Sequence, residues 1–417
     1  MASILACLPL EERAMKAKDY VGMNVYWFGL AFMWNGLHPI ILPALLLQFS
    51  PEALKNTYLG ALTFAGLLLA MVVQPMAGAR SDRTRSRWGR RRLWIVAGTA
   101  LSLVVLVAMA LAGSLWGLFV AYLLLQLASN MAHGPAQGLI PDLIPGERRG
   151  LASGIKNFFD MGGLVLTSLV AGYLMGAGNP VLAFTVIGAV LAVCATITVV
   201  TTREPSSLDL APDAGEGQSG LFGLDLRRYP SYAWLLSSRF FILLGVYAVQ
   251  GFAQYFIRDR LGVAEPAQVT GNLMATIGLA LTLLVFPAGL LSDRFGRLRL
   301  NLIAGSMASL GILLLIFVQD VTTLYIFGAV VGMATGIFLS VNWALATDLV
   351  PPEEAGKYLG ISNFATAGAA ATSRLAGPLI DGLNALRPDQ YLGYPALFVL
   401  ASGSALLGTL LLLRTRR

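Results

Sequence analysis

DLIPGERRGLASGIKNF, from Asp142 to Phe158, and DLVPPEEAGKYLGISNF, from Asp348 to Phe364, are two copies of one motif set 206 positions apart. A second pair, GARSDR at Gly78–Arg83 and GLLSDR at Gly289–Arg294, recurs at 211 positions. Both pairs are polar stretches between apolar segments, where chance similarity between membrane helices does not produce matches. The sequence therefore predicts two related halves.

The composition places this repeat in a membrane protein. Of 417 residues, 56% are hydrophobic and 12% charged, whereas soluble domains carry roughly 25% charged residues. A helix that crosses the hydrocarbon core needs about 20 apolar residues. We predict an all-α integral membrane protein with twelve such spans, near 22–48, 57–79, 93–112, 115–139, 151–176, 180–201, 231–256, 268–291, 300–318, 322–346, 357–381 and 392–413.

The basic residues predict how the spans are oriented. Most of the 29 Lys and Arg residues lie near the two termini and in every second loop, which the positive-inside rule assigns to the cytoplasm. We therefore expect a multi-pass protein of the plasma (inner) membrane with both termini cytoplasmic. The net charge of +7 follows from this topology, and no nucleic-acid partner is expected.

The repeat and one polar break predict the domains. Residues 203–230 contain Pro205, Pro212 and a segment rich in Gly, Ser, Asp and Glu, which is typical of a flexible linker. We predict a six-helix bundle over 1–202, a cytoplasmic linker over 203–230 and a second six-helix bundle over 231–417.

The sequence lacks the residue patterns of an enzyme. Its 2 cysteines and 2 histidines provide neither a disulfide framework nor a metal cluster. We find no phosphate-binding loop and no nucleophile–base pattern. We therefore expect no enzymatic activity, no cofactor and no metal.

The loop after the second span carries a family resemblance. GARSDRTRSRWGRRR, from Gly78 to Arg92, resembles the motif of the major facilitator superfamily at that loop. TRSRWG (84–89) is similar to the glycoside–pentoside–hexuronide cation symporters. The stretches 72–92, 128–143 and, more weakly, 32–43 resemble the sucrose-transporter branch of that family. The resemblance implies two pseudo-symmetric bundles that rock about a midplane site, a cavity lined by spans 1, 4, 7 and 10, and a monomer.

The same loop predicts a cytoplasmic gate. Asp82 ends the second span, where its carboxylate can pair with Arg83, Arg90 or a neighbouring helix end. Gly78 permits a close helix approach, and Gly89 a tight turn. An alternative is that the arginines only fix topology. The other gate residues, at equivalent positions of the repeat, are Asp142, Asp293, Arg294 and Asp348.

Charged residues inside the spans are candidates for coupling, because such charges are costly in a membrane. Lys156 and Asp160 lie four apart on one helix face and can neutralise each other. Arg239 is about midway along its span and could partner Asp160 across the halves. Arg374 and Asp381 are expected toward the outer end, as an outer gate or a structural pair.

Uncharged polar residues accompany these charges. Amides and aromatic planes suit a neutral, hydroxyl-rich ligand such as a sugar, although such residues also hold membrane helices together. His133 could exchange protons or pack, and His38, before Pro39, is expected to bond the loosened backbone. The candidate substrate-binding residues are Trp34, Asn35, Gln126, Asn130, Gln137, Gln250, Gln254, Asn342, Trp343 and Asn363.

The chain departs from the family where coupling is expected. The positions of the cation-binding carboxylates of melibiose permeases are Ala70, Gln74 and His133 here, so no oxygen-rich sodium site is expected. The acid and the arginine of sucrose transporters correspond to Gln126 and Gln137. If protons are coupled, Asp160 is the first candidate and His133 the second, and uniport stays open.

We predict a secondary transporter of a sugar, a glycoside or a similar small organic solute, which works by alternating access and for which proton symport is one option. The alternatives are a carrier of an amphipathic or lipid-like solute and a membrane receptor or assembly factor on the same fold. The expected partners are the substrate, protons if they are coupled, and the lipid bilayer.

Overall fold

A computed structural model describes residues 16–208, 229–350 and 355–415, and in these residues the chain forms helices and no strand. The first half begins with α1 (Ala17–Gly36), which continues through the π-helix η3 (Leu37–Ile41) into α2 (Leu42–Leu46). The helices that follow are η4 (Glu52–Leu54), α3 (Lys55–Asp82), α4 (Arg92–Ala110), α5 (Leu115–Gln137), α6 (Leu139–Leu143), η5 (Gly146–Arg148), α7 (Arg149–Gly176) and α8 (Pro180–Thr201).

The second half repeats this order of long helices. It contains α9 (Pro230–Leu261), α10 (Pro266–Phe295), α11 (Arg297–Leu314), η7 (Leu315–Phe317), α12 (Val321–Asp348), α13 (Ala355–Ser373), η8 (Arg374–Ala376), α14 (Gly377–Leu386), η9 (Pro388–Gln390) and α15 (Gly393–Leu412). In the described residues, 11 helical segments are long and apolar enough to cross a membrane. The consecutive elements α13, η8 and α14 supply one more, so the predicted fold class is confirmed.

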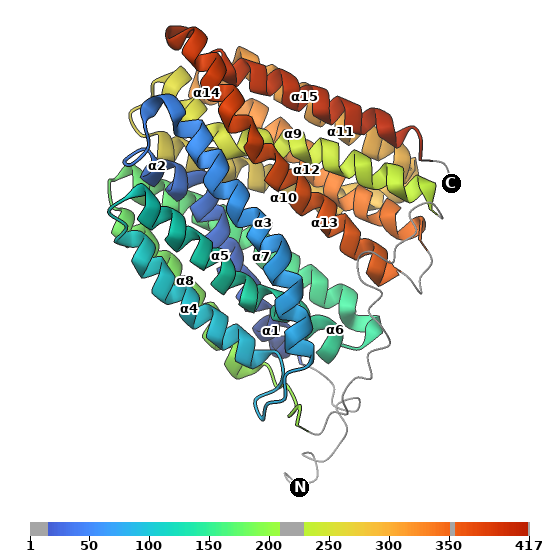
Figure 1. Ribbon diagram of the computed structural model, residues 1–417. Coiled ribbons are helices and arrows are strands. Elements are labelled where there is room, and N and C mark those ends of the chain that lie inside the picture. Colours follow the sequence, from blue (N-terminus) through green and yellow to red (C-terminus); the bar gives the residue numbers. More distant parts are fainter. Residues whose placement is uncertain (1–15, 209–228, 351–354, 416–417) are drawn as a thin grey trace.

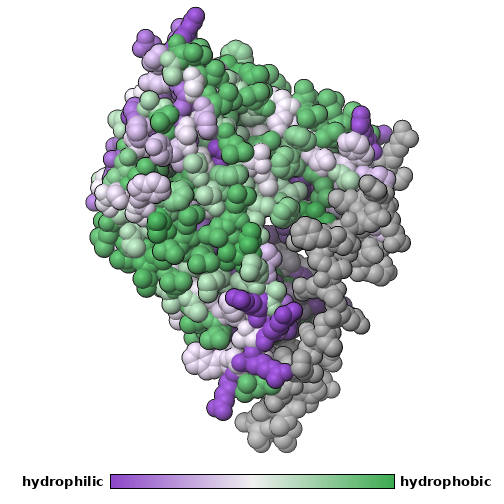
Figure 2. Space-filling model, in the orientation of Figure 1, coloured by the Kyte–Doolittle hydropathy of each residue, from purple (hydrophilic) through white to green (hydrophobic). Residues whose placement is uncertain are grey.

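The helices pack as two bundles. In the first, α1 packs on α7 and α8, and α5 on α3 and α4; in the second, α9 packs on α15 and α13, and α12 on α10 and α11. The two bundles lie side by side, and their ribbons diverge toward the end that holds α6 and the start of α13 (Figure 1). Apolar side chains cover most of the visible face, with hydrophilic ones at its two ends (Figure 2). This surface is that of a multi-pass membrane protein.

The two ends of the molecule are named here by one residue each. The Arg91 end carries the loop between α3 and α4, and the Asp259 end carries the C-terminal part of α9. The bundles meet through α3 against η8 and α14, and through α7 against α10. These contacts join backbones directly: a Cβ built on Gly271 would lie 2.2 Å from the carbonyl oxygen of Ser168.

The predicted domain boundaries stay a prediction. Residues 209–228 of the predicted linker lie outside the described residues, as do both chain ends. Helix α8 begins at Pro180, where the predicted span 180–201 starts, because proline is favoured at the first helical position.

The first span contains an irregularity that the sequence only hinted at. Because Pro39 has no N–H and its ring crowds the preceding turn, the helix widens into a π-turn at Leu37–Ile41. The side-chain amide of Gln254 is placed with its nitrogen toward this turn, the orientation in which both its oxygen and its nitrogen have partners. The nitrogen then donates to the carbonyls of Pro39 (3.0 Å) and Ile40 (2.8 Å). His38, which was predicted to bond this loosened backbone, has its Nε2 2.9 Å from the hydroxyl of Tyr122 on α5 instead.

Candidate functional site

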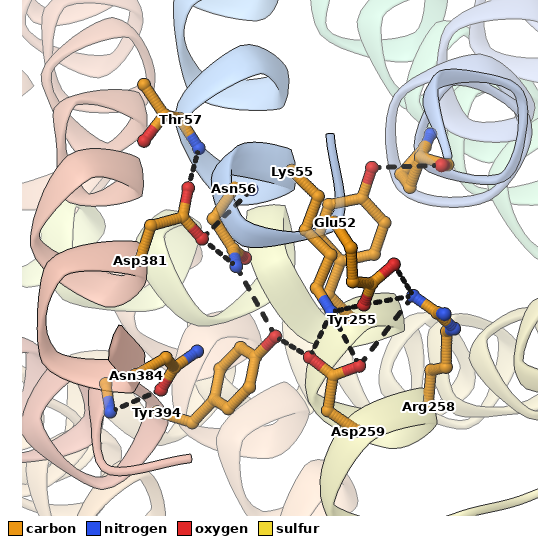
Figure 3. Close-up of polar contacts among 12 residues, drawn as sticks. Glu52, Lys55, Asn56, Thr57, Tyr255, Arg258, Asp259, Asp381, Asn384 and Tyr394 are labelled. Carbon is orange, nitrogen blue, oxygen red and sulfur yellow. Dashed lines mark hydrogen bonds and ion pairs between the residues drawn. The ribbon is translucent and has the colours of Figure 1, made fainter. Parts of the chain in front are cut away.

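A charged network joins the two bundles at the Asp259 end (Figure 3). Lys55, at the start of α3, lies 2.8 Å from the carboxylate of Asp259 on α9 and 2.5 Å from that of Glu52. Arg258 donates to Glu52 at 3.0 and 3.1 Å, and the hydroxyl of Tyr394 donates to Asp259 at 2.5 Å. The side chains of Lys55 and Asp259 are only 4% and 3% exposed, so a nearly dry ion pair connects the halves.

Asp381 extends this network by capping a helix of the other half. Its carboxylate accepts from the backbone N–H of Thr57 at 2.6 Å and from the side-chain amide of Asn56 at 2.8 Å. These groups belong to the first turn of α3, where free N–H groups and the helix dipole favour a negative charge. The expected pairing of Asp381 with Arg374 does not form: the carboxylate contacts the opposite bundle instead.

The cross-links are confined to one end of the molecule. Besides the network, Gln254 reaches the π-helix, and the hydroxyl of Tyr255 donates to the carbonyl of Pro43 at 3.0 Å. In the part of the chain that the structure describes, these are the hydrogen bonds and ion pairs that connect the bundles. All of them lie toward the Asp259 end, so this end is closed and the Arg91 end has no polar cross-link between the bundles among those residues.

At the Arg91 end, a buried arginine holds three segments of the first bundle together. The guanidinium of Arg91 pairs with Asp82, at the end of α3, and with Asp142, in α6, at 2.8 Å. Burial disfavours the charged guanidinium, but the hydrogen bond and charge of Asp142, together with Asp82, outweigh it, and the pKa of Arg91 is raised. Arg90 also reaches Asp142, at 2.9 Å.

The second bundle repeats this cluster. Arg297 pairs with Asp348 at 2.5 Å and with Asp293 at 3.3 Å. Asp293 and Asp348 correspond in the repeat to Asp82 and Asp142. Each cluster stays within its own bundle, so the predicted gate residues tie helix ends together rather than joining the halves here.

The remaining gate residues have separate outcomes. Gly89 adopts φ +89 and lies against the carboxylate of Glu204, so the predicted tight turn before α4 is observed. Gly78 lies beside Gly134 of α5, and its carbonyl accepts from Arg91 at 3.4 Å. Arg83 is exposed, and Arg294 lies near the ring of Phe295. The partner of Asp82 is Arg91, which the sequence analysis did not single out.

A polar chain crosses the interior of the first bundle. The amide of Asn130 donates to Gln126, and the amide of Gln126 donates to the hydroxyl of Tyr122 at 2.8 Å. That hydroxyl lies 2.9 Å from Nε2 of His38, whose ring stacks on Trp34 at 4.9 Å. Gln126 and Asn130 are 2% and 4% exposed, and they bond each other within α5, whereas Tyr122 links α5 to His38 of η3. A ligand contact would have to replace the bonds of the two amides.

The predicted pair on α7 forms. Nζ of Lys156 lies 3.0 Å from the carboxylate of Asp160, and it also lies over the ring of Trp27 at 4.1 Å. The ring of Trp27 in turn meets the edge of His133 at 5.2 Å. His133 lies 3.4 Å from the amide of the exposed Gln137. Charged, aromatic and amide groups of α1, α5 and α7 therefore meet inside the first bundle.

The second bundle has its own interior cluster, around Arg239 of α9. Its guanidinium donates to the hydroxyl of Thr366 at 2.9 Å and to the amide oxygen of Asn342 at 2.8 Å. It also lies 6.0 Å from the ring of Trp343, which is 39% exposed. Since Asp160 pairs with Lys156, the expected partnership between Arg239 and Asp160 is absent from the structure.

The other predicted substrate residues are scattered. Asn35 donates to the carbonyl of Ala31 in its own helix at 2.9 Å. Gln250 lines a small apolar cavity inside the second bundle, between α9, α10, α12 and α15. Gln254 is committed to the π-helix, whereas Asn363 is exposed on α13.

The network at the Asp259 end was not predicted from the sequence. Lys55 and Arg258 are among the few basic residues outside the loops assigned to the cytoplasm, and the sequence analysis gave them no role in a site. The usable signal was a pair of charge clusters at two helix ends, Glu52 with Lys55 near the start of α3 and Arg258 with Asp259 near the end of α9. Such spacing does not reveal which of the residues is buried or which bundle it faces.

Comparison with known proteins identifies the family. Residues 28–413 match the family described as MFS/sugar transport protein. The uncharacterized symporter sll1374 of Synechocystis sp. is 33% identical over 135 residues, which cover 29% of this chain and 24% of that protein. Sucrose transport protein SUC4 of Arabidopsis thaliana is 33% identical over 144 residues, which cover 30% and 27%. The matches thus span about a quarter of the length of these relatives.

Solved structures share the fold. A bacterial homolog of the human lysosomal transporter Spinster, inward-facing and unoccupied, superposes with a TM-score of 0.73 at 17% identity, covering 97% of this chain and 99% of that one. A peptide transporter, POT, in complex with sulfate, gives a TM-score of 0.74 at 15% identity, covering 99% and 97%. The matched proteins are transporters and not enzymes, as the sequence analysis expected.

Proposed function

We propose that this chain, which belongs to the MFS/sugar transport protein family, is a secondary transporter that moves a sugar or a similar small organic solute by alternating access. The observation that carries the proposal is the one-sided closure of the molecule. Two bundles that are cross-linked only toward the Asp259 end form one of the two states that such a mechanism needs.

The orientation of the spans gives this state a direction. The Arg91 end carries the basic loops, so the positive-inside rule places it in the cytoplasm of a cell with the chain in its plasma membrane. The described state is then closed to the outside and open toward the cytoplasm. Opening to the outside requires that the bonds of Asp259 and Asp381 to the first bundle break.

The substrate site lies between the interior clusters of the two bundles. Trp343, which is 39% exposed, offers a ring face, and Gln137 and Asn363 offer exposed amides for hydroxyl groups. Asp160 is the proposed coupling residue, because protonation of its carboxylate would release Lys156 from the ion pair. A proton could thereby change the charge seen by a bound solute.

Uptake by purified protein in liposomes tests the function. We expect labelled sugars from a panel of neutral and acidic members to enter faster than into empty liposomes, and faster still with an inward proton gradient. Asp160→Asn should abolish the effect of the gradient, whereas Asp389→Asn, an exposed acid outside the bundles' interior, should leave it intact.

The outcomes separate the parts of this proposal. Transport that responds to the gradient equally in the wild type and Asp160→Asn removes Asp160 as the coupling residue. Transport that ignores pH in both identifies a uniporter. If no member of the panel moves, the transporter function itself is rejected in favour of a receptor or assembly role.

A further inference from the structure

We propose that the substrate of this carrier bears a negative charge and that Arg374 and Arg239 bind it. The inference rests on the transporter function proposed above and names the chemistry of the substrate: a small organic anion with a carboxylate or phosphate group. It replaces the neutral ligand that the amides and aromatic rings alone had suggested.

Arg374 lies between the two bundles. It begins η8, where the α-helical turns of α13 end and α14 has not begun. Its guanidinium lies directly over Gly251 of α9, where an added Cβ would come within 1.6 Å of a guanidinium nitrogen. The glycine therefore makes room for the side chain. Its backbone borders the first bundle, because a Cβ added to Gly60 of α3 would come within 2.3 Å of the carbonyl oxygen of Arg374.

This arginine has no acidic partner in the described part of the chain. Its Nε is buried and has no hydrogen-bond partner among the described residues. None of the ion pairs formed in the described part of the chain includes Arg374. Asp381, the acid nearest along its own helix, is committed to Asn56 and Thr57. A guanidinium so placed is a site for an anion that the protein does not itself supply.

Arg239 is a second cation that no carboxylate of the described residues pairs with. It is 5% exposed, and its acceptors are the neutral oxygens of Thr366 and Asn342. The amide nitrogen of Asn342 is itself buried without a partner among the described residues. Arg239 and Asn342 thus offer a charged and a neutral donor side by side, which is what an oxyanion accepts.

The two arginines belong to one polar path. Arg239 belongs to α9, and the guanidinium of Arg374 lies over Gly251 of the same helix. Thr366, which bonds Arg239, and Arg374 are separated along α13 by roughly 12 Å, at about 1.5 Å per residue. Arg239 is the nearer to the open Arg91 end, so an anion that enters there would meet Arg239 first and Arg374 deeper in the molecule.

The interior acids do not neutralise this path. Asp160 pairs with Lys156 and so contributes no net charge. Asp259 pairs with Lys55 in the network that closes the other end. Asp381 is buried and forms no ion pair among the described residues, but its carboxylate is bonded to Asn56 and Thr57 at the Asp259 end. It balances at most one of the two arginines, so an excess of positive charge is left that a neutral sugar would not compensate.

Two matched pairs of solutes test the charge of the substrate. Gluconate and sorbitol differ by a carboxylate in place of a hydroxymethyl group, and glucose 6-phosphate and glucose differ by a phosphate. Binding is measured on the purified full-length protein by thermal stabilisation, and flux is measured in liposomes. We expect at least one acid to bind about 10- to 100-fold more tightly than its neutral partner, as charge-assisted hydrogen bonds allow.

Three variants test whether the two arginines cause this preference for the acid. Arg374→Gln and Arg239→Gln should each remove most of the difference between acid and neutral solute. Gly251→Ala keeps both charges but displaces the guanidinium of Arg374, so it should also weaken binding of the acid. Arg260→Gln is the control, because Arg260 is an exposed arginine at the Asp259 end that donates to the carbonyl of Gln390.

Each result decides the question. A neutral solute that binds and moves as well as its acid, or an acid preference unchanged in Arg374→Gln and Arg239→Gln, overturns the proposal and leaves the transporter function standing. Binding of acids without any flux supports the anion site and rejects transport. If no solute binds or moves, both proposals fail.

Discussion

Asp381 shows how one carboxylate helps to hold the Asp259 end closed. It caps the first turn of α3 from the opposite bundle, through the N–H groups of Asn56 and Thr57. Such a cap exists only while the bundles are together at this end. The side chain therefore contributes to one conformational state and not to the stability of either bundle alone.

Asp381→Asn should open the Asp259 end. Hydrogen bonds to a charged group contribute about 1.5–3 kcal/mol, so the population of the closed state should fall about 10- to 100-fold relative to the open one. We would measure how fast an impermeant thiol reagent outside intact cells reaches a cysteine at Asn35, with Cys7 and Cys194 replaced. Asp389→Asn is the control, and equal rates in the two variants would contradict the role of Asp381.

Arg91 and Arg297 occupy equivalent positions but unequal surroundings. The side chain of Arg91 is 7% exposed and that of Arg297 is 26% exposed. Arg91→Gln leaves Asp82 and Asp142 without their shared cation and should destabilise the protein by about 1–3 kcal/mol. Arg297→Gln should cost less than about 1 kcal/mol because its acids are largely solvated. The melting temperatures of the two variants in detergent check this order, and the reverse order would refute it.

At the scale of elements, the contact between α7 and α10 depends on residues that lack side chains. Gly172 and Gly271 face each other there, and a Cβ on Gly271 would lie 2.8 Å from the Cα of Gly172. The helices consequently touch backbone to backbone near the Asp259 end. This spacing closes the bundles on that side without any polar group.

Gly271→Ala should separate α7 from α10. Alanine stabilises a helix relative to glycine by roughly 0.5–1 kcal/mol. A loss of closure in this variant would therefore come from the steric clash and not from a weaker helix. We expect faster thiol labelling at position 35 from outside, as for Asp381→Asn. Gly403→Ala, where the new Cβ has no atom within 4 Å, should not change the rate. Unchanged labelling in Gly271→Ala would show that the helices accommodate the methyl group.

The sequence predicted where the helices lie along the chain better than it predicted which residues of each helix face which neighbour. The length of an apolar segment and the proline at its start, Pro180 in α8, are local features of the sequence. The predicted span 180–201 therefore agrees with the bounds of α8. The π-turn at Leu37–Ile41 adds a residue to one turn and rotates everything that follows it. The contacts of His38 and Gln254 depend on that rotation, which hydropathy does not encode.

The candidate site was predicted in part for a related reason. Lys156 and Asp160 pair because four residues along a helix bring two side chains together. Arg91, rather than Arg83, binds Asp82 because a loop determines which arginine of a basic run turns inward. The pairs Lys55–Asp259 and Asp381–Thr57 join segments more than 200 and 300 residues apart, and only the packed bundles bring them together.

At the scale of the whole molecule, the two ends differ in charge pattern and should face different compartments. A cysteine that replaces Arg85, in the exposed basic loop, should react with an impermeant reagent only in permeabilised cells. A cysteine that replaces Asp389, in η9 near the other end, should react in intact cells. Both positions are exposed in the structure, so the opposite pattern would invert the topology and with it the direction of closure.

The unpaired guanidinium groups of Arg374 and Arg239 have an electrical consequence. A unit charge carried across the membrane changes the free energy by about 2.3 kcal/mol per 100 mV. When the bundles rock, these two cations move through part of the membrane potential. The equilibrium between the two states of the empty carrier therefore depends on voltage. An inside-negative potential then favours the conformation in which they lie nearer the cytoplasm, and a bound anion cancels part of that bias. The membrane potential, besides the solute gradient, would thus decide which way the empty carrier rests.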